Sequence, residues 1–314
     1  MLEEVRTPEP RQGEVRVRAE ALGVGRPDIL VRNGTYKWMP ALPTIPGAEM
    51  VGIVDRLGEG ADPRLLGKRV LVSARELIIR GGCYAQCICV PDKSLYTVPV
   101  SIDPVDAVSL PNFQVALALF ELSGCASPKT ILVPGAAGAV ATALAQVARS
   151  RGVKSIGTAS TQEKAAFARA QGFDDVLLPE ASALYERVLS RTGGRGVDLA
   201  FDHLGGQSLV DCIRALAPFG TALSFNVVTG APTEDVFALM RSLLGRSLAV
   251  RTFSMHTLDS DVDTRRALMG RAIEEMARGV LRAPPALRFP LSDASGAHEL
   301  QESGSSLGKI VLLP

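Results

Sequence analysis

"PGAAGAVATALAQVARSRG", residues 134–152, directly follows the apolar run "TILV" at 130–133. Its first residues are small, and small residues allow the chain to turn tightly between a strand and a helix. Beyond the turn, Val140, Leu144 and Val147 recur at helical spacing and would form one apolar face. The stretch therefore predicts a buried strand, a tight turn and a helix that packs on a sheet.

The predicted turn is suited to binding a phosphate group. Its small residues recur at three-residue intervals, as the glycines of a dinucleotide-binding turn do. Backbone N–H groups and the helix dipole attract a pyrophosphate there, and the missing side chains let it approach. The alternative is a tight strand-to-helix corner that binds nothing. The residues expected to contact a cofactor are Gly135, Ala136, Ala137, Gly138, Ala139 and Val140.

The end of the next predicted strand, "GTASTQEK" at 157–164, distinguishes between the two nicotinamide dinucleotides. Sites for NAD usually carry Asp or Glu about 20 residues after the turn, but no carboxylate occurs in residues 122–162. Hydroxyl groups and a lysine suit a 2′-phosphate, which an acid would repel. The pattern predicts NADPH, although Lys164 alone also fits a solvated helix face. The candidate contacts are Thr158, Ser160, Thr161 and Lys164.

The segments around this stretch predict two kinds of architecture. From about residue 110, apolar strands alternate with amphipathic helices, which is typical of a parallel, doubly wound sheet. The earlier residues hold short alternating strands such as "EVRVRA" at 14–19, which indicate a small antiparallel barrel or sandwich. The same patterns predict a strand over 83–90 and a helix over 208–220. The predicted fold class is therefore α/β, with a β-rich domain beside a Rossmann domain.

The composition narrows the possible partners and compartment. The chain has 314 residues, 46% apolar and 21% charged, which suggests two ordinary globular domains. A net charge of +1 disfavours a nucleic-acid partner. No apolar run approaches the roughly 18 residues of a membrane span, and the polar start "MLEEVRTPEP" does not resemble a signal peptide. Five cysteines without disulfide-framework spacing favour a reducing, cytoplasmic compartment, and we expect neither a nucleic-acid nor a membrane partner.

Taken in order along the chain, several motifs resemble one family. They are "RNGTY", "PTIPGAEMVGIVDRLGEG", "GKRV", "GGCYAQ", "GAAGAVA", "GTASTQEK", "TGGRGVDLAFDHLGG" and "SLGKIVLLP". The sequence is similar to the zinc-independent, zeta-crystallin-like quinone oxidoreductases of the medium-chain dehydrogenase/reductase superfamily. The resemblance implies a GroES-like catalytic domain from residues 1–109 and 283–314. It also implies an NADPH-binding Rossmann domain over 110–282, and a homodimer.

The same comparison with the family predicts that no metal is bound. Zinc-dependent relatives carry a histidine in Gly-His-Glu, where this chain has Gly47-Ala48-Glu49, and no set of four closely spaced cysteines is present. Cys83, Cys87 and Cys89 would share one strand face, which suits buried small apolar residues better than compact tetrahedral zinc coordination. Without a Lewis acid, alcohol dehydrogenation is disfavoured.

The resemblance also indicates a catalytic residue and further cofactor contacts. Tyr36 resembles the tyrosine that lines the family's active cleft, where it would stack on a flat ring or donate its O–H; the alternative is a half-buried surface tyrosine. His203, in "DHLGG", is more consistent with a histidine bonded to backbone than with a general acid. His256 and His298 belong to no recognisable cluster. The additional cofactor candidates are Gly205, Asn226, Phe253 and Lys309, of which Lys309 equally fits a surface position.

Three functions fit these observations. The first is NADPH-dependent transfer of hydride to a quinone or conjugated carbonyl. The second is reduction of an enoyl thioester of the enoyl-CoA or polyketide type, which needs a proton at Cα as well. The third is an NADPH-binding structural or regulatory protein with little catalysis. Gly25 and Val115 give this third function some support, because the family often has Asn and Thr at those positions.

Overall fold

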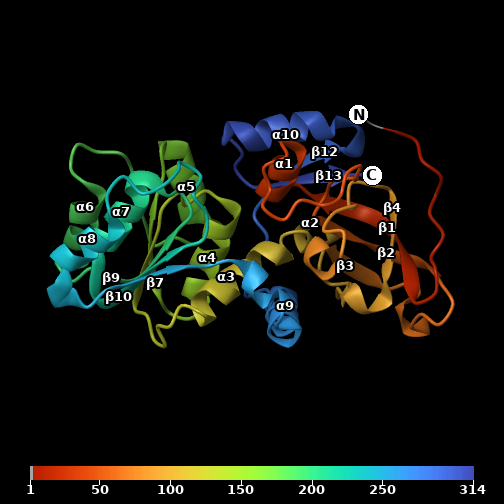
Figure 1. Ribbon diagram of the computed structural model, residues 1–314, viewed down its shortest axis with the longest axis horizontal. Coiled ribbons are helices and arrows are strands. Elements are labelled where there is room, and N and C mark those ends of the chain that lie inside the picture. Colours follow the sequence, from red (N-terminus) through yellow and green to blue (C-terminus); the bar gives the residue numbers. More distant parts are fainter. Residues whose placement is uncertain (1–2) are drawn as a thin grey trace. The chain divides into compact units, whose positions relative to one another are not determined.

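The computed structural model describes residues 3–314, and its contacts divide the chain into two compact units. Unit 1 contains the chain up to Pro111 together with Met269–Pro314, and unit 2 is Asn112–Leu268. Each unit is built around one sheet (Figure 1). The predicted α/β class, with a mainly antiparallel sheet and a separate parallel sheet, is confirmed.

Unit 1 contains a seven-stranded sheet in which strands from the two ends of the chain lie side by side. Its order is β12-β13-β1-β2-β3-β5, and β4 pairs with β1. The last strand of the chain, β13, pairs antiparallel with β1 and parallel with β12. The strands are β1 (Glu14–Gly23), β2 (Glu49–Leu57), β3 (Arg69–Ser73), β4 (Cys87–Pro91), β5 (Tyr96–Thr97), β12 (Ala286–Pro290) and β13 (Lys309–Leu313).

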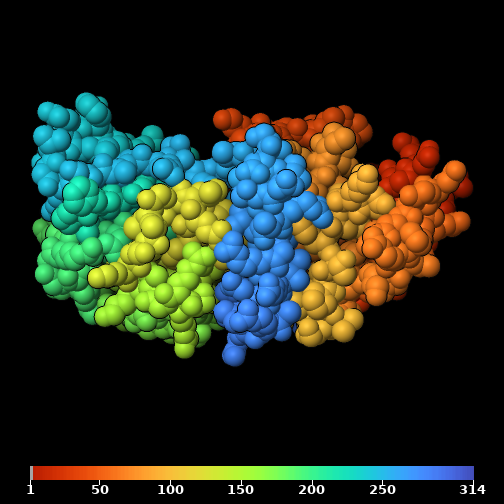
Figure 2. Space-filling view, turned by 90° about the horizontal axis from the view of Figure 1, so that it is seen from below, coloured from red at the N-terminus to blue at the C-terminus, as the bar shows by residue number. Residues whose placement is uncertain are grey.

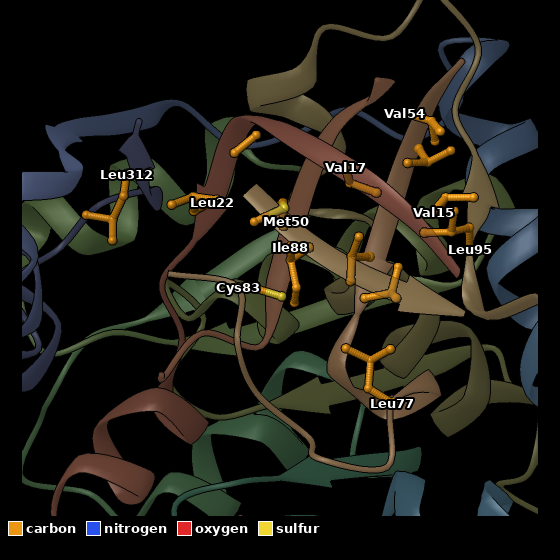
Figure 3. Packing of buried hydrophobic residues seen from close by; sticks show 14 of the residues in the cluster. Val15, Val17, Leu22, Met50, Val54, Leu77, Cys83, Ile88, Leu95 and Leu312 are labelled. Atoms are coloured by element: carbon orange, nitrogen blue, oxygen red, sulfur yellow. The ribbon is translucent and has the colours of Figure 1, made fainter. Parts of the chain in front are cut away.

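Alternating apolar residues explain why these segments form a sheet with a core on one side. In β1, Val15 and Val17 are fully buried, and they belong to one hydrophobic cluster with Met50 and Ile88 from neighbouring strands (Figure 3). Leu312 of β13 belongs to the same cluster. The helices of this unit are α1 (Arg26–Arg32), α2 (Pro104–Ala107) and α10 (Ala294–Ser303); α3 (Leu110–Glu121) and α9 (Val262–Ala277) span the points where the chain passes between the units.

Unit 2 contains a six-stranded sheet in the order β11-β10-β9-β6-β7-β8, and its strands are parallel. The strands are β6 (Thr130–Val133), β7 (Lys154–Thr158), β8 (Asp175–Leu177), β9 (Val197–Asp202), β10 (Leu216–Ser224) and β11 (Ala249–Thr252). The connecting helices are α4 (Ala139–Ser150), α5 (Gln162–Ala170), α6 (Leu184–Arg191), α7 (Gly206–Arg214) and α8 (Val236–Ser242). Helix α7 packs against both α6 and α8, and the green-to-cyan atoms of this part of unit 2 adjoin in Figure 2.

Two predicted elements differ from the structure. The helix predicted over 208–220 ends at Arg214, and β10 begins at Leu216. Pro218 cannot continue a helix because it lacks an N–H, and Phe219 has a φ of 63°, outside the helical region. The strand predicted over 83–90 begins only at Cys87. Cys83 is fully buried in the preceding loop, whereas Cys87 and Cys89 are half-buried, so the three do not share one buried strand face.

Candidate functional site

The predicted cofactor residues of unit 2 gather at the carboxyl edge of its parallel sheet. This is the edge where ligands of doubly wound sheets bind. Backbone hydrogen bonds tie the segments there to one another: the Ala136 N–H donates to the Thr158 carbonyl oxygen at 2.8 Å, and the Phe253 N–H donates to that of Ser224 at 2.9 Å. Asn226 follows β10 at the same edge.

The turn after β6 has the conformation that its small residues predict. Gly135 has a φ of 65°, and its N–H donates to the Thr158 Oγ1 at 3.1 Å. A Cβ at Gly135 would lie 2.9 Å from the His203 Cε1, so the imidazole occupies the space beside the turn. The Gly138 N–H donates to the Gly135 carbonyl oxygen at 3.0 Å and closes the turn. Thr158 therefore braces the turn through its hydroxyl group.

The start of α4 fits a pyrophosphate. Gly138 is the N-cap, and within the described chain no side chain caps the helix. The N–H groups of its first turn, at Ala139, Val140 and Ala141, have no partner one turn earlier, so they suit an anion. Beneath the turn, Ala136 is fully buried, and a Cβ at Gly157 would lie 2.6 Å from the Ala136 Cβ. The small side chains therefore let the turn lie directly on the neighbouring strand.

The segment after β7 combines exposed hydroxyl groups with a lysine. Thr161 is the N-cap of α5, and its Oγ1 accepts the Lys164 N–H at 3.2 Å. Ser160 and Thr161 are exposed and Lys164 is half-buried. These groups, at the N-terminus of a helix, provide the donors and positive charge that an added phosphate requires.

The position of Gly205 requires a glycine because two loops pack closely there. Its φ is 77°, and a Cβ there would lie 2.3 Å from the Gly230 carbonyl oxygen, in the loop after β10. The fully buried Asp202 accepts the Gly205 N–H at 2.9 Å and the Ser208 hydroxyl at 2.7 Å. Burial raises the pKa of Asp202, and these hydrogen bonds oppose the rise. Gly205 thus lets two loops of the carboxyl edge pack together.

Tyr36, the predicted catalytic residue, lies in unit 1, just after α1. Its N–H donates to the Leu30 carbonyl oxygen at 3.1 Å, and its ring centroid lies 5.8 Å from that of Trp38. Both rings are half-buried, and the Lys37 Nζ lies 5.3 Å from the centroid of the Trp38 ring. The loop therefore presents an aromatic surface suited to a flat, apolar molecule.

Lys309, the other predicted contact in unit 1, forms a buried ion pair. Its Nζ lies 2.6 Å from the Glu49 Oε2, and the two side chains are only 4% and 15% exposed. The pair sits against Gly23, where a Cβ would lie 2.3 Å from the Glu49 Oε2. Its ammonium therefore has a partner inside the protein, and a surface position for Lys309 is wrong.

The sequence patterns did not reveal the contacts that the histidines make. His256 Nδ1 lies 3.1 Å from the Asp259 Oδ2, and His203 lies against the turn at Gly135. His298 contacts both Tyr84 and Arg32, so the expectation that it belongs to no cluster is wrong. The partners of His298 are more than 200 residues away in sequence, and no local spacing reveals such contacts.

Residues 3–314 were searched for clusters of metal-binding side chains and for membrane-spanning helices. No group of three or more His, Cys, Asp or Glu side chains in this range is arranged to hold a metal ion. No helix in the same range has the length and apolar character needed to cross a membrane.

Two family models match the sequence. Residues 11–100 match the alcohol dehydrogenase GroES-like domain, and residues 171–312 match the zinc-binding dehydrogenase family. The quinone oxidoreductase of Rattus norvegicus is 27% identical over 319 residues, covering 99% of this chain and 92% of that protein. The 2-haloacrylate reductase of a Burkholderia species is 28% identical over 320 residues, covering 99% and 94%.

A solved structure agrees with both family models. The Escherichia coli quinone oxidoreductase complexed with NADPH aligns with a TM-score of 0.86 and 27% identity, covering 99% of this chain and 95% of the other. The two family models, the full-length relatives and this structure all agree with the resemblance seen in the sequence. The chain therefore belongs to the quinone oxidoreductase group of the medium-chain dehydrogenase/reductase superfamily.

Proposed function

We propose that the protein is an NADPH-dependent oxidoreductase that transfers hydride to a quinone or conjugated carbonyl without zinc. The observation that carries the proposal is the carboxyl edge of unit 2. There an uncapped helix N-terminus follows a glycine turn, and the adjoining segment, which has no carboxylate up to Gln162, provides Thr161 and leads to Lys164. Relatives named quinone oxidoreductase, and one solved with NADPH, support the same activity.

The protein's own residues bind and orient in this reaction, while NADPH when bound supplies the hydride. The first-turn N–H groups of α4 would hold the pyrophosphate, with the Gly135–Gly138 turn close against it. Ser160, Thr161 and Lys164 would hold the 2′-phosphate. Gly205, Asn226 and Phe253 would approach the remainder of the dinucleotide, as the family resemblance suggests.

The acceptor is proposed to bind against the aromatic surface of Tyr36 in the GroES-like part, residues 1–109 and 283–314. The Tyr36 ring would stack on it or donate its O–H to the developing negative oxygen. For Lys309, contact with a cofactor phosphate is compatible with the structure only if its ammonium keeps or exchanges its bond to Glu49.

Dinucleotide binding tests the cofactor half of the proposal. In titration calorimetry we expect NADPH to bind more tightly than NADH, and Lys164→Glu to weaken NADPH binding at least about tenfold, because one charge-assisted contact is lost and a repulsion is added. Lys154→Glu is the matched control, since Lys154 begins β7 at the opposite edge of the sheet. Equal affinities for the two dinucleotides would contradict the assignment of NADPH.

The acceptor is tested by following NADPH oxidation with naphthoquinone and with crotonyl-CoA in parallel. The 2-haloacrylate reductase relative favours including acceptors with a carbon–carbon double bond next to a carboxyl group. Turnover only of the thioester would support the enoyl-thioester reductase alternative. Tight NADPH binding without turnover of any acceptor would support the structural or regulatory alternative.

We also propose a homodimer that forms through β11 and a reducing, cytoplasmic location. β11 is the outer strand of the sheet in the described chain, and three of its four residues are exposed. An exposed edge strand offers backbone groups for pairing with a second copy. Ala249→Glu would place like charges at the proposed interface, and sedimentation should then show a monomer where the unaltered protein is a dimer.

The proposed location follows from the cysteines. All five are free thiols, which suits a reducing compartment.

A further inference from the structure

A series of polar side chains, each in contact with the next, leads through unit 1 from its surface to a buried carboxyl group. The Arg32 Nη2 lies 2.6 Å from the Glu302 Oε2, and both side chains are about two-fifths exposed, at 42% and 39%. The Arg32 Nη1 lies 3.3 Å from the Nδ1 of His298, and the Nε2 of that ring lies 3.1 Å from the Tyr84 hydroxyl oxygen. The Tyr84 hydroxyl in turn faces the carboxyl group of Asp28.

The first link determines the direction of the others. A guanidinium group only donates hydrogen bonds, so the His298 Nδ1 must accept and its proton must be on Nε2. Nε2–H then donates to the Tyr84 oxygen, and the Tyr84 O–H is left to donate toward Asp28. Burial and the charge of Arg32 both lower the pKa of His298, which favours this neutral ring.

Asp28 lies at the inner end of this chain and is only 3% exposed. Its Oδ2 accepts the Gly25 N–H at 2.8 Å, and the Ala48 N–H also donates to the carboxyl group. The charged groups that face it are Glu49 and Lys309, with the Cys83 thiol and the Tyr84 hydroxyl nearby. Burial is the largest cause that raises the pKa of Asp28 to about 7, and Glu49 adds to it while Lys309 opposes it.

Tyr84 is held in place by the loop that also contacts Asp28. Its N–H donates to the Pro46 carbonyl oxygen at 2.9 Å. Gly47 has a φ of 103°, and a Cβ there would lie 2.4 Å from the Tyr84 Cδ1. The hydroxyl therefore has little freedom to leave its position between His298 and Asp28.

We propose that His298 and Tyr84 relay protons between the surface beside Arg32 and the buried carboxyl group of Asp28. The proposal rests on the proposed function, because hydride addition to a quinone or conjugated carbonyl leaves an anion that must take up one proton. Asp28 would store that proton inside the unit.

The relay step conserves protons and leaves every oxidation state unchanged. Arg32 first withdraws from the His298 Nδ1, and a hydronium ion of the solvent gives a proton to that nitrogen and is left as water. The N–H bond at Nε2 breaks as its proton passes to the Tyr84 oxygen, and the Tyr84 O–H bond breaks as its proton passes to the Asp28 carboxylate. His298 ends as the Nδ1–H tautomer, and Asp28 ends as a neutral carboxylic acid.

Nuclear magnetic resonance tests the resting state of the relay. The ¹⁵N shifts of His298 should show a proton on Nε2 and none on Nδ1 at neutral pH. A proton on Nδ1 in the resting protein would overturn the proposal, because Nε2 could then not donate to Tyr84.

Infrared spectroscopy after a pH jump tests proton transfer in the protein alone. The C=O band of protonated Asp28, identified by its loss in Asp28→Asn, should appear when the pH is lowered through about 7. Tyr84→Phe should slow its appearance at least about tenfold, a smaller effect than the roughly 10²–10⁴-fold that positioned acid–base groups contribute to catalysis. Tyr96→Phe is the matched control, since Tyr96 is also buried and donates to Glu76 at 2.6 Å. Equal rates in Tyr84→Phe and the unaltered protein would overturn the relay.

Turnover provides the second readout. In Tyr84→Phe and His298→Gln, we expect kcat to fall about tenfold with KM nearly unchanged and with a larger solvent deuterium isotope effect, because proton delivery becomes limiting. Unchanged kcat and isotope effects in both variants would overturn the proposal. The infrared measurement needs no acceptor, so a working relay in a protein that reduces none of the acceptors would contradict the proposed function alone.

Discussion

Gly135 shows how one residue can serve both the fold and the site. Its positive φ and its contact with His203 exclude a larger side chain from the turn after β6, where we propose that the pyrophosphate binds. We expect Gly135→Ala to cost about 1–2 kcal/mol from the left-handed backbone alone, plus a further loss from the contact with His203. Gly152→Ala is the matched control, because Gly152 has a φ of 68° with nothing within 4 Å of the added Cβ. Equal unfolding free energies and unchanged NADPH binding in the two variants would contradict this account.

The buried ion pair of Lys309 and Glu49 predicts that removal of one charge lowers the stability of the protein strongly. Lys309→Met should cost about 3–5 kcal/mol in the free energy of unfolding, because it leaves a largely buried carboxylate without its partner. Loss of the lysine also removes a charge that lowers the pKa of Asp28, so that pKa should rise. The more exposed pair of Arg151 and Glu121 is the control, and Arg151→Met should cost less than about 1 kcal/mol. Adding Glu49→Gln to Lys309→Met should recover part of the lost free energy of unfolding, as measured by chemical denaturation.

These residues also show what the sequence could predict about the site. The tight turn at Gly135 and the helix start at Thr161 could be predicted because each depends on neighbours a few residues away, and their contacts with a cofactor stay a prediction. The contact of Tyr84 with His298 joins residues 214 positions apart, and that of Lys309 with Glu49 joins residues 260 apart. Such pairings depend on how the strands assemble, and the motifs around Tyr84 and Lys309 gave no sign of their partners.

Among the elements, α5 combines a structural role with the proposed phosphate contacts. Thr161→Val should cost about 1 kcal/mol because the Lys164 N–H loses its capping oxygen. It should also weaken NADPH binding. Asp235 caps α8 in the same way, accepting the Ala238 N–H at 2.8 Å, and Asp235→Ala should give a similar loss of stability with NADPH affinity unchanged. Thermal unfolding with and without NADPH compares the two helices directly.

The strands and helices of unit 2 were more predictable than their boundaries. Parallel strands buried on both faces form apolar runs, so "TILV" and "TALSF" were recognisable. The start of β10 was not, because "ALAPFG" continues the apolar pattern of α7 although Pro218 prevents helix there. β10 begins where Leu216 pairs with Val197, a contact that the local pattern does not contain.

For the whole molecule, Asp28 predicts how stability depends on pH. Its pKa is about 7 in the folded protein against an ordinary value of 3.8, so the folded chain binds more protons between these values. The free energy of unfolding should therefore fall as pH rises from about 4 to 7, by about 4 kcal/mol from this group. Asp28→Asn should remove that slope in denaturation at a series of pH values.

Asp198 provides a contrast with the opposite sign. Hydrogen bonds from Arg195 and from the backbone lower its pKa, despite its partial burial. Its contribution to stability is present above the ordinary pKa and is lost as pH falls through the lowered value. Asp198→Asn should therefore reduce stability at neutral pH and leave the slope between pH 4 and 7 in place. The same slope in Asp28→Asn as in the unaltered protein would contradict the role of Asp28.

The pairing of β13 with β1 has a consequence for synthesis in the cell. On the ribosome, the residues of β1 emerge almost three hundred positions before their neighbour in the sheet, Leu22 beside Leu312. Unit 2, Asn112–Leu268, lies wholly between them, so it can finish folding while the first strands still lack a partner. A nascent chain stalled before residue 309 should therefore expose apolar strand surface that chaperones recognise, and release of the last few residues should end that exposure.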